Sequence, residues 1–282
     1  MTLLSIVIPC YNSGATLEEA VTSALAQANP TVGLAVEVIV VNDGSSDPDT
    51  LTALEKLPSS VQVVNQENAG LPAARNAGLS LAKGDFLLPL DADDWLDRRF
   101  ATTAVQLMQD DPSIGFVFAA LDLFGEAEGV LVKRYNPFDQ LFLNQLPYCL
   151  CYRRSTWETN GPYDETMRDG YEDWEFNVRL GAKGIAGHAI PEPMFHYRVA
   201  ASGMLQAKSR KLHSQLWRSI QDRHPERYRL PSLVRAWRRH GATAYPAALF
   251  FGLWAVHRLL PAQGFNRLFT WLLSRSHSAR VQ

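Results

Sequence analysis

Cysteine is scarce in this sequence. Only Cys10, Cys149 and Cys151 occur among 282 residues, and this odd number does not suggest a disulfide framework. One residue separates Cys149 from Cys151, whereas paired zinc-binding cysteines are usually two or more residues apart. The sequence therefore argues against a disulfide-stapled secreted domain and favours a reducing, cytoplasmic compartment.

A long apolar run is also missing. The first fourteen residues, MTLLSIVIPCYNSG, lack the positive charges and the small-residue cleavage site of a signal peptide. The longest uncharged run in the C-terminal part, residues 241–256, has 16 residues and contains Pro246. A membrane-spanning helix needs roughly 20 apolar residues, so we expect no transmembrane span.

Two common nucleotide-binding motifs are absent. No G-x-x-x-x-G-K-[ST] loop occurs in the chain, and no G-x-G-x-x-G follows the first apolar run. These absences exclude a P-loop NTPase and a typical dinucleotide enzyme. We find no nucleic-acid recognition motif or stacking platform, so we expect no nucleic-acid partner.

Acidic residues are rare in the last quarter of the chain. Residues 207–282 hold fourteen Lys and Arg but only two acids, Asp222 and Glu226, for a formal charge of +12. The preceding 206 residues hold 13 basic and 27 acidic residues, for a formal charge of −14. The sequence thus divides into an acidic body over 1–206 and a basic, aromatic-rich tail over 207–282.

Strand and helix signals alternate through the first 121 residues. Apolar runs rich in branched residues predict strands at 3–9, 36–41, 61–65, 85–90 and 114–121. Between them, helical periodicity and stop signals predict helices at about 16–28, 46–57, 71–82 and 99–110. This alternation predicts an α/β fold with a mostly parallel central sheet and helices on both faces.

Polar residues follow three of these predicted strands. The segments are Cys10-Tyr11-Asn12, Asn42-Asp43-Gly44-Ser45 and Asp91-Ala92-Asp93-Asp94. Each one alone reads as an ordinary polar turn. Because ligands bind at the carboxyl ends of strands in such sheets, the three together indicate a binding site at one edge.

The third segment concentrates negative charge. Three carboxylates lie within four positions directly after an apolar strand, and such a cluster repels itself unless a cation compensates it. Carboxylate oxygens suit hard cations such as Mg²⁺ or Mn²⁺, to which substrate phosphates often supply further ligands. The cluster therefore suggests a site for a metal ion and a nucleoside diphosphate.

The segment after residue 121 is less regular. Residues 122–170 carry turn signals without a clear period, and we expect short strands and loops over the site. Residues 168–184 predict a helix with Glu172 and Asp173 in its first turn, where the helix dipole alone favours acids. Residues 185–199 predict extended segments broken by prolines.

Five segments in this order resemble those of the family 2 glycosyltransferases: SIVIPCYNSGATLEEAVTSALAQ, VIVVNDGSSD, NAGLPAARNAGL, FLLPLDADD and YEDWEFNVRL. The resemblance covers roughly residues 3–200. It implies the GT-A fold and transfer of a sugar, of the hexosyltransferase type, from a nucleotide sugar to an acceptor hydroxyl with inversion at the anomeric carbon. The basic tail then forms a C-terminal helical extension.

By this resemblance, Pro9, Tyr11 and Asn12 line the nucleotide pocket. Asp43 accepts a hydrogen bond from the base, typically uracil N3–H, which makes a UDP-linked donor the expectation. Many relatives have two aspartates where this chain has Asn42-Asp43, so the nucleobase stays open. Arg75 approaches the nucleotide and its phosphates, with a solvated helix residue as the alternative.

The resemblance also implies the catalytic and metal residues. Asp91 touches the ribose or the metal site, and Asp93 binds the Mg²⁺ or Mn²⁺ that bridges the diphosphate. Asp173, with Glu172 beside it, is the general base. His196 matches a position where some relatives place a metal or phosphate ligand, and a purely structural histidine is the alternative.

Two other functions remain open on the residues alone. A carboxylate-metal phosphatase is one, but Trp95 stands where the motif D-x-D-x-[TV] requires Thr or Val. A non-catalytic nucleotide-sugar binding protein is the other, against which Asp93 and Asp173 weigh. No Q-x-x-R-W follows Asp173, which argues against a processive synthase of the cellulose or hyaluronan type.

The tail mixes Arg and His with Trp, Phe and Leu over residues 233–261. This pattern suits a position on an anionic membrane surface, and a helical cap packed on the acidic body is the alternative. We expect a lipid-linked or cell-surface glycan as the acceptor. The expected location is cytoplasmic, with peripheral attachment to the cytoplasmic face of the inner membrane.

Overall fold

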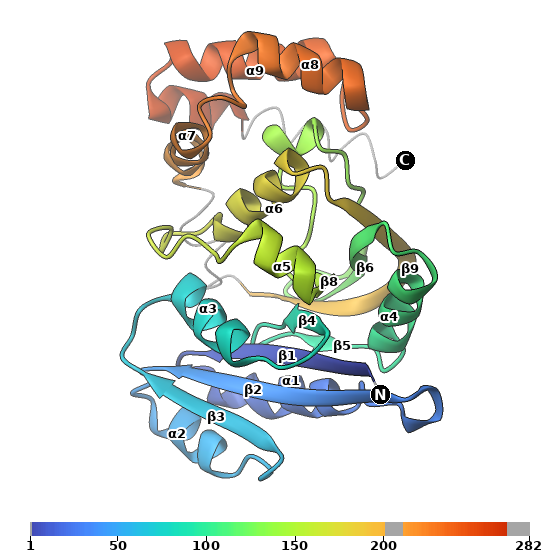
Figure 1. Ribbon diagram of the computed structural model, residues 1–282. Helices are drawn as coiled ribbons and strands as arrows, with labels where there is room; N and C mark the ends of the chain where they lie inside the picture. Colours follow the sequence, from blue (N-terminus) through green and yellow to red (C-terminus); the bar gives the residue numbers. More distant parts are fainter. Residues whose placement is uncertain (1, 201–210, 270–282) are drawn as a thin grey trace.

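A computed structural model describes residues 2–200 and 211–269 (Figure 1). Its strands are β1 (Thr2–Cys10), β2 (Leu34–Asp43), β3 (Val61–Gln66), β4 (Phe86–Pro89), β5 (Trp95–Leu96), β6 (Ile114–Gly125), β7 (Gly129–Leu131), β8 (Cys151–Arg153) and β9 (Ala186–Val199). Its α-helices are α1 (Gly14–Leu25), α2 (Pro48–Glu55), α3 (Leu71–Leu81), α4 (Phe100–Asp110), α5 (Arg154–Asn160), α6 (Glu172–Ala182), α7 (His213–Arg223), α8 (Leu230–His240) and α9 (Ala247–Leu259).

One mixed sheet runs through the body in the order β3-β2-β1-β4-β8-β6-β9-β5, with β7 paired to β6. The first four strands along the chain pair in parallel. Strand β8 then pairs antiparallel to β4 and β6, and the longest ladder, β6 with β9, is parallel again. The predicted α/β class and mostly parallel sheet are confirmed.

Helices cover both faces of the parallel part. Figure 1 shows α1 and α2 on one face of β1–β3 and α3 on the other. Since β1 is covered on both sides, Leu4, Ile6, Val7 and Ile8 are all buried, and the strand reads as a continuous apolar run. Helix α3 approaches β1 so closely that a Cβ on Gly78 would clash with a methyl group of Val7.

Strand β9 corrects one expectation. Residues 185–199 were expected as segments broken by prolines, yet 186–199 form one strand along β6. The register shifts between Ala119 and Leu121 on the partner strand, opposite the segment that contains Pro191 and Pro193. Such irregularities accommodate prolines, which have no N–H for the ladder. Helix α5 is a further element that the sequence did not predict.

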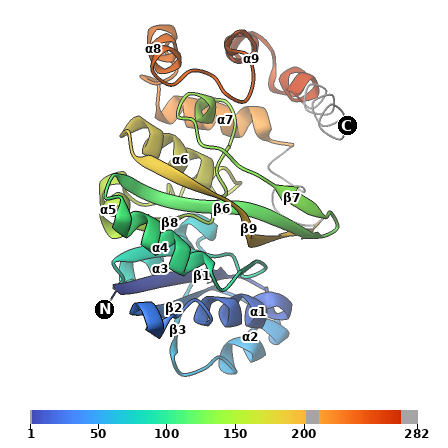
Figure 2. The same cartoon turned by 90° about the vertical axis from the view of Figure 1, so that its right-hand side faces the viewer.

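The tail helices form a cap on the body. Figure 2 shows α7, α8 and α9 together at the end of the molecule away from β1–β3. Their apolar side chains share one cluster with Phe138, Leu141 and Phe142 and with Trp174 of α6. The alternative of a packed helical cap is therefore correct for residues 211–269, and contact with a membrane stays a prediction. No helix in the described ranges has both the length and the apolar character needed to cross a bilayer.

Replacing the buried Trp217 by alanine should lower the free energy of unfolding by about 3–5 kcal/mol. Its side chain is 1% exposed, and its indole Nε1 donates a hydrogen bond to the Leu141 carbonyl oxygen at 3.0 Å. Trp237→Ala is the matched control, because that tail tryptophan is 41% exposed. Urea denaturation followed by circular dichroism measures both, and equal losses would contradict the packed cap.

Candidate active site

The ends of three parallel strands meet at one edge of the sheet. Cys10 lies opposite Asn42, and Val7 lies opposite Pro89, which brings the segment after β4 beside the end of β1. The amide of Leu90 donates to the Val7 carbonyl oxygen at 2.9 Å and extends this pairing by one residue. The polar segments that follow β1, β2 and β4 therefore share this edge, as the sequence predicts.

Asn12 shapes the first loop of the site. Its backbone has φ 50°, in the left-handed region that asparagine tolerates. Its side-chain Oδ1 accepts hydrogen bonds from the amides of Ser46 (2.9 Å) and Asp47 (3.0 Å), which ties the loop after β1 to the loop after β2. Pro9 is buried near the strand end, whereas Tyr11 is 51% exposed and presents its ring to solvent.

Asp43 organises the turn that leads into α3. Its carboxylate accepts hydrogen bonds from Gln66 Nε2 (2.7 Å) and from the amides of Ala69 (2.8 Å) and Gly70 (2.9 Å). Gly70 has φ 92°, which an L side chain rarely adopts, so glycine is needed there. Asp43 is thus a buried organising residue, and its contact with a nucleobase stays a prediction.

Three carboxylates gather after β4. One oxygen from each of Asp91, Asp93 and Asp94 lies within 4.8 Å of the others. Asp93 is the most accessible of the three. The surrounding protein nevertheless removes part of its hydration, and this loss, followed by the charge of the nearby Asp91, raises the pKa of Asp93 to about 6. An all-oxygen set with one accessible carboxylate fits a hard divalent cation.

The third carboxylate, Asp94, is the buried member of the cluster. It accepts hydrogen bonds from Tyr148 Oη at 2.6 Å and from the Arg198 amide at 2.7 Å. Burial, and then Asp93 and Asp91, raise its pKa well above the usual range. Tyr148 Oη also accepts from the Asp91 amide at 2.9 Å, so one phenol holds both ends of the segment.

A buried arginine joins this cluster to the second carboxylate motif. Arg75 is 1% exposed; its Nη2 donates to both oxygens of Asp91, at 2.7 and 3.0 Å, and its Nη1 donates to Glu172 at 2.6 Å. Burial disfavours the charged guanidinium and lowers the pKa of Arg75. The negative charges of Asp91 and Glu172 have the larger combined effect, so the pKa of Arg75 is raised overall. The guanidinium also lies over the rings of Tyr148 and Tyr163. The expected phosphate contact stays a prediction, and the contacts present are with carboxylates.

Asp173 lies at the start of α6. It follows Tyr171, which adopts φ 67°, and Glu172, which Arg75 holds. One Asp173 oxygen accepts from Asn144 Nδ2 at 2.8 Å, and the other accepts from the Trp174 amide at 2.7 Å. Burial raises the pKa of Asp173, while Arg75 and the Asn144 hydrogen bond oppose that rise. Burial likewise raises the pKa of Glu172 against the opposing charge of Arg75.

His196 does not join the cluster. Within the described ranges, the carboxylates that could hold a metal form a group without it. Pairing of β5 with β9 places His196 opposite Trp95, and the two rings stack with centroids 3.3 Å apart. Its Nδ1 lies 2.9 Å from Asp122 Oδ2. These contacts fit the alternative of a structural histidine. A role for His196 as a metal or phosphate ligand stays a prediction.

Sequence reasoning missed three side chains that hold the site together. Tyr148 and Asn144 lie in the irregular segment before β8, where no periodic signal marks them. Arg198 donates from Nε to the Asp93 carbonyl oxygen at 2.9 Å and pairs with Glu19 at 2.7 Å. Arg198 lies two residues after His196, and it contacts the carboxylate cluster, whereas His196 does not.

Comparison with known proteins agrees with this geometry. Residues 5–174, more than half of the chain, match glycosyl transferase family 2. The chain therefore belongs to that family, and its fold is the GT-A fold.

Two relatives come from Bacillus subtilis (strain 168). EpsH, named as a glycosyltransferase, is 26% identical over 194 residues, which cover 63% of this chain and 56% of EpsH. TuaG, named as a glycosyltransferase of teichuronic acid biosynthesis, is 28% identical over 217 residues, which cover 73% of this chain and 82% of TuaG. This chain thus spans little more than half the length of EpsH.

Two solved structures share the fold. S. aureus TarS 1–349 in complex with UDP-GlcNAc gives a TM-score of 0.61 at 19% identity, covering 78% of this chain and 65% of TarS. The mannosyltransferase PcManGT from Pyrobaculum calidifontis, in complex with GDP-Man and Mn²⁺, gives 0.58 at 20% identity, covering 93% of this chain and 84% of PcManGT.

Arg75→Ala should be strongly destabilising, by about 3–5 kcal/mol, because it leaves two carboxylates without their buried partner. Arg75→Lys should recover only part of this, since one ammonium cannot reproduce the forked contacts to Asp91 and Glu172. Arg99→Lys is the control, because Arg99 pairs with Asp97 at the exposed surface. Thermal and urea unfolding measure the effect, and an Arg75→Ala variant as stable as the control would contradict the bridge.

Proposed function

We propose that this chain transfers a sugar from a UDP-linked donor to an acceptor hydroxyl with inversion at the anomeric carbon. One observation carries the proposal: Arg75 joins the carboxylates that follow β4 to the pair that opens α6. An inverting transfer needs these two functions side by side, one at the leaving diphosphate and one at the attacking hydroxyl.

The donor diphosphate binds beside Asp91 and Asp93. Their oxygens would hold Mg²⁺ or Mn²⁺, and such a cation would offset the negative charge that builds on the leaving diphosphate. The accessibility of Asp93 and the all-oxygen composition of the cluster support this assignment. The Mn²⁺ complex of PcManGT, which shares the fold, is consistent with it.

The nucleoside lies across the ends of β1 and β2. Tyr11 offers an exposed ring for contact with the base, and Asp43 accepts from uracil N3–H. Asn12 ties the loop after β1 to the loop after β2 and so fixes how far apart these two loops lie. TarS, bound to UDP-GlcNAc in the same fold, supports a UDP-linked donor.

Asp173 accepts the proton of the acceptor hydroxyl. Asn144 and the Trp174 amide hold its carboxylate, and burial raises its pKa, which makes it a stronger base than an exposed aspartate. Glu172 is engaged by Arg75 and therefore serves to position Asp173.

The acceptor is a lipid-linked or cell-surface glycan, presented at the cytoplasmic face of the membrane. The relative TuaG, named for teichuronic acid biosynthesis, supports a polysaccharide acceptor. A phosphatase is disfavoured, because Trp95 packs against His196 where that motif requires a Thr or Val. A non-catalytic role is disfavoured because hydrogen bonds from Asn144 and the Trp174 amide hold the Asp173 carboxylate in place, and nucleotide binding alone does not need such a carboxylate.

Binding of UDP should require both the divalent ion and Asp93. In calorimetry with Mn²⁺, Asp93→Ala should weaken UDP binding, and EDTA should weaken binding to the parent in the same way. Asp110→Ala removes an exposed carboxylate on α4 and serves as the control. Equal UDP affinity with and without the ion would contradict the assignment of a divalent metal site to Asp91 and Asp93.

Asp173→Asn should lower turnover by about 10²–10⁴-fold, the usual contribution of a general base. UDP affinity should change little, because Asp173 faces the acceptor. In the parent, turnover should rise with pH as Asp173 loses its proton, and this rise should lie above the ordinary aspartate range because burial raises the pKa. Steady-state rates across pH measure both effects, and near-normal turnover of the variant would remove Asp173 from the mechanism.

A further inference from the structure

The backbone enters α6 through an unfavourable conformation. Tyr171, directly before Glu172, has φ 67°, and among the described residues Asn12 is the one other non-glycine residue with a positive φ. This region disfavours a bulky L side chain, whereas glycine and asparagine tolerate it. Such strain persists where the surroundings hold a residue in place, and it gathers at functional sites. A tyrosine at this position therefore points to a role for its side chain.

His213 of α7 contacts both residues that flank the Glu172–Asp173 pair. Its Nδ1 lies 2.9 Å from the hydroxyl oxygen of Tyr171, and the two rings meet edge to face. The imidazole also lies nearly parallel to the ring of Trp174, with 6.1 Å between the centroids. One side chain of the cap therefore braces the chain immediately before and immediately after the two carboxylates.

A histidine is an unexpected choice at this place in the cap. His213 is 5% exposed and stacks on Phe269 with centroids 3.9 Å apart, close to Trp217. Burial, and then the nearby His257, lower the pKa of His213 to about 3, so the ring is neutral at physiological pH. Its Nε2 is buried without a hydrogen-bond partner in the ranges that the structure describes. An unpaired buried nitrogen is unfavourable, and phenylalanine would avoid it, so the contact with Tyr171 is what histidine adds.

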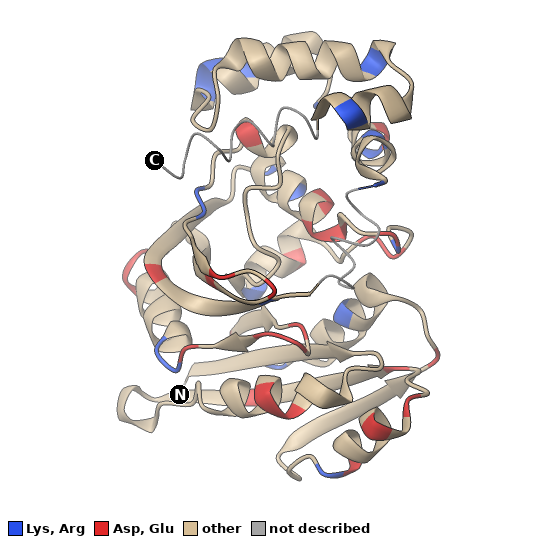
Figure 3. Ribbon diagram, turned by 180° about the vertical axis from the view of Figure 1, so that it is seen from behind, with Lys and Arg blue, Asp and Glu red and all other residues tan. Residues whose placement is uncertain are grey.

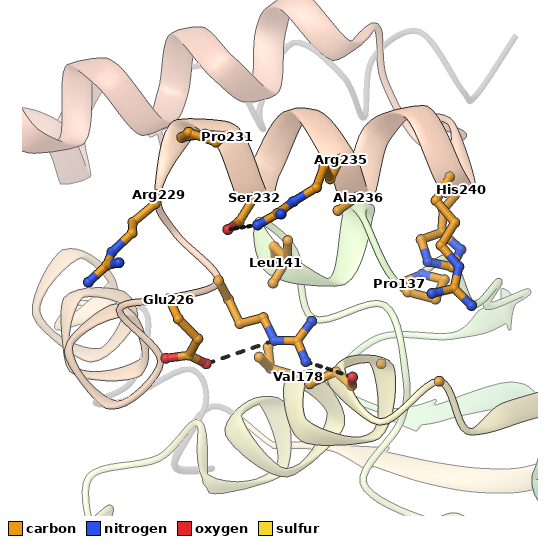
Figure 4. Close-up of a pocket in the computed structure, with 15 residues that line it drawn as sticks. Pro137, Leu141, Val178, Glu226, Arg229, Pro231, Ser232, Arg235, Ala236 and His240 are labelled. Carbon is orange, nitrogen blue, oxygen red and sulfur yellow. Dashed lines mark hydrogen bonds and ion pairs between the residues drawn. The ribbon is translucent and has the colours of Figure 1, made fainter.

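The other polar contacts between the cap and α6 lie further along the helix. Figure 3 shows acidic residues spread over the body and mainly basic residues on the tail helices. Consistent with this, His224 lies 2.8 Å from Glu175, and Arg227 donates to the Ala182 carbonyl oxygen at 2.6 Å. A hollow of about 690 Å³ separates α8 from the C-terminal end of α6 (Figure 4). The cap thus holds the later turns of α6 by contacts that are separate from the one at its start.

We propose that His213 is a positioning residue for sugar transfer. Its hydrogen bond keeps Tyr171 in the left-handed conformation and so sets the direction in which Asp173 faces the acceptor hydroxyl. The inference deepens the proposed function and rests on it, because there Asp173 is the general base. His213 acts through its neighbours on α6, and Glu172 is fixed independently by Arg75.

The variant H213F tests this role, because phenylalanine keeps a ring in the stack and removes Nδ1. UDP release is followed with Mn²⁺ and either UDP-glucose or UDP-GlcNAc, whichever the parent uses faster. The turnover number should fall about 10- to 100-fold, as expected when a reacting group is displaced. The KM for the donor and the affinity for UDP should stay those of the parent. The urea midpoint should not fall, and a purely structural histidine would not give this combination.

Three further variants separate the role from general packing. H224Q is the matched control, because His224 also links the cap to α6, but at Glu175, one turn further along. It should lower the urea midpoint and leave turnover of the folded enzyme unchanged. Y171F removes the other partner of the same hydrogen bond, and Y171F/H213F should be no slower than either single variant. In a D173N background, H213F should have no additional effect.

Several results would overturn the inference alone. Normal turnover of H213F beside a slow D173N is one, and a joint loss of stability and turnover in H213F is another. Equal slowing in H224Q would show that any loosening of the cap matters, and an additional loss in H213F/D173N would show that the effect bypasses Asp173. Absence of UDP release from the parent, or normal turnover of D173N, would overturn the proposed function and this inference with it. Circular dichroism verifies that each variant is folded.

Discussion

The buried guanidinium of Arg75 is the interaction on which the rest of the site depends. An arginine that is 1% exposed needs charged partners, and it finds them in Asp91 and Glu172, which lie 81 residues apart in the sequence. Because breaking such a pair leaves an uncompensated buried charge, the segment after β4 and the start of α6 cannot separate without a large cost. The same contact brings the diphosphate end and the base end of the proposed reaction together.

The tail takes part in this arrangement from the opposite side of α6. His213 of α7 lies 2.9 Å, through its Nδ1, from the hydroxyl of Tyr171, the residue that precedes Glu172 in a left-handed conformation. Its ring also stacks near Trp174. Helix α7 of the tail therefore supports the start of α6.

The sequence predicts well what is local and periodic. The strands and helices before residue 121 follow from apolar runs and helical spacing, and the polar edge follows from where those runs end. Tyr148, Asn144 and the bridging role of Arg75 depend on contacts between distant segments, which no period records. Resemblance left His196 either as a ligand or as a structural residue; strand pairing places it opposite Trp95, and a ligand role stays a prediction. The tail's aromatic residues suggested a membrane, yet many of them pack against the body.

The anomeric configuration of the product shows whether this chain transfers its sugar with inversion. The full chain is incubated with Mn²⁺ and an α-linked UDP-sugar, and the sugar released to water or acceptor is followed by NMR before mutarotation. We expect release of UDP with a β-configured product, because Asp173 is proposed to direct attack at the face opposite the diphosphate. An α-configured product would rule out inversion, and a failure to release nucleoside diphosphate from UDP-, GDP- and dTDP-linked donors alike would rule out sugar transfer from these donors.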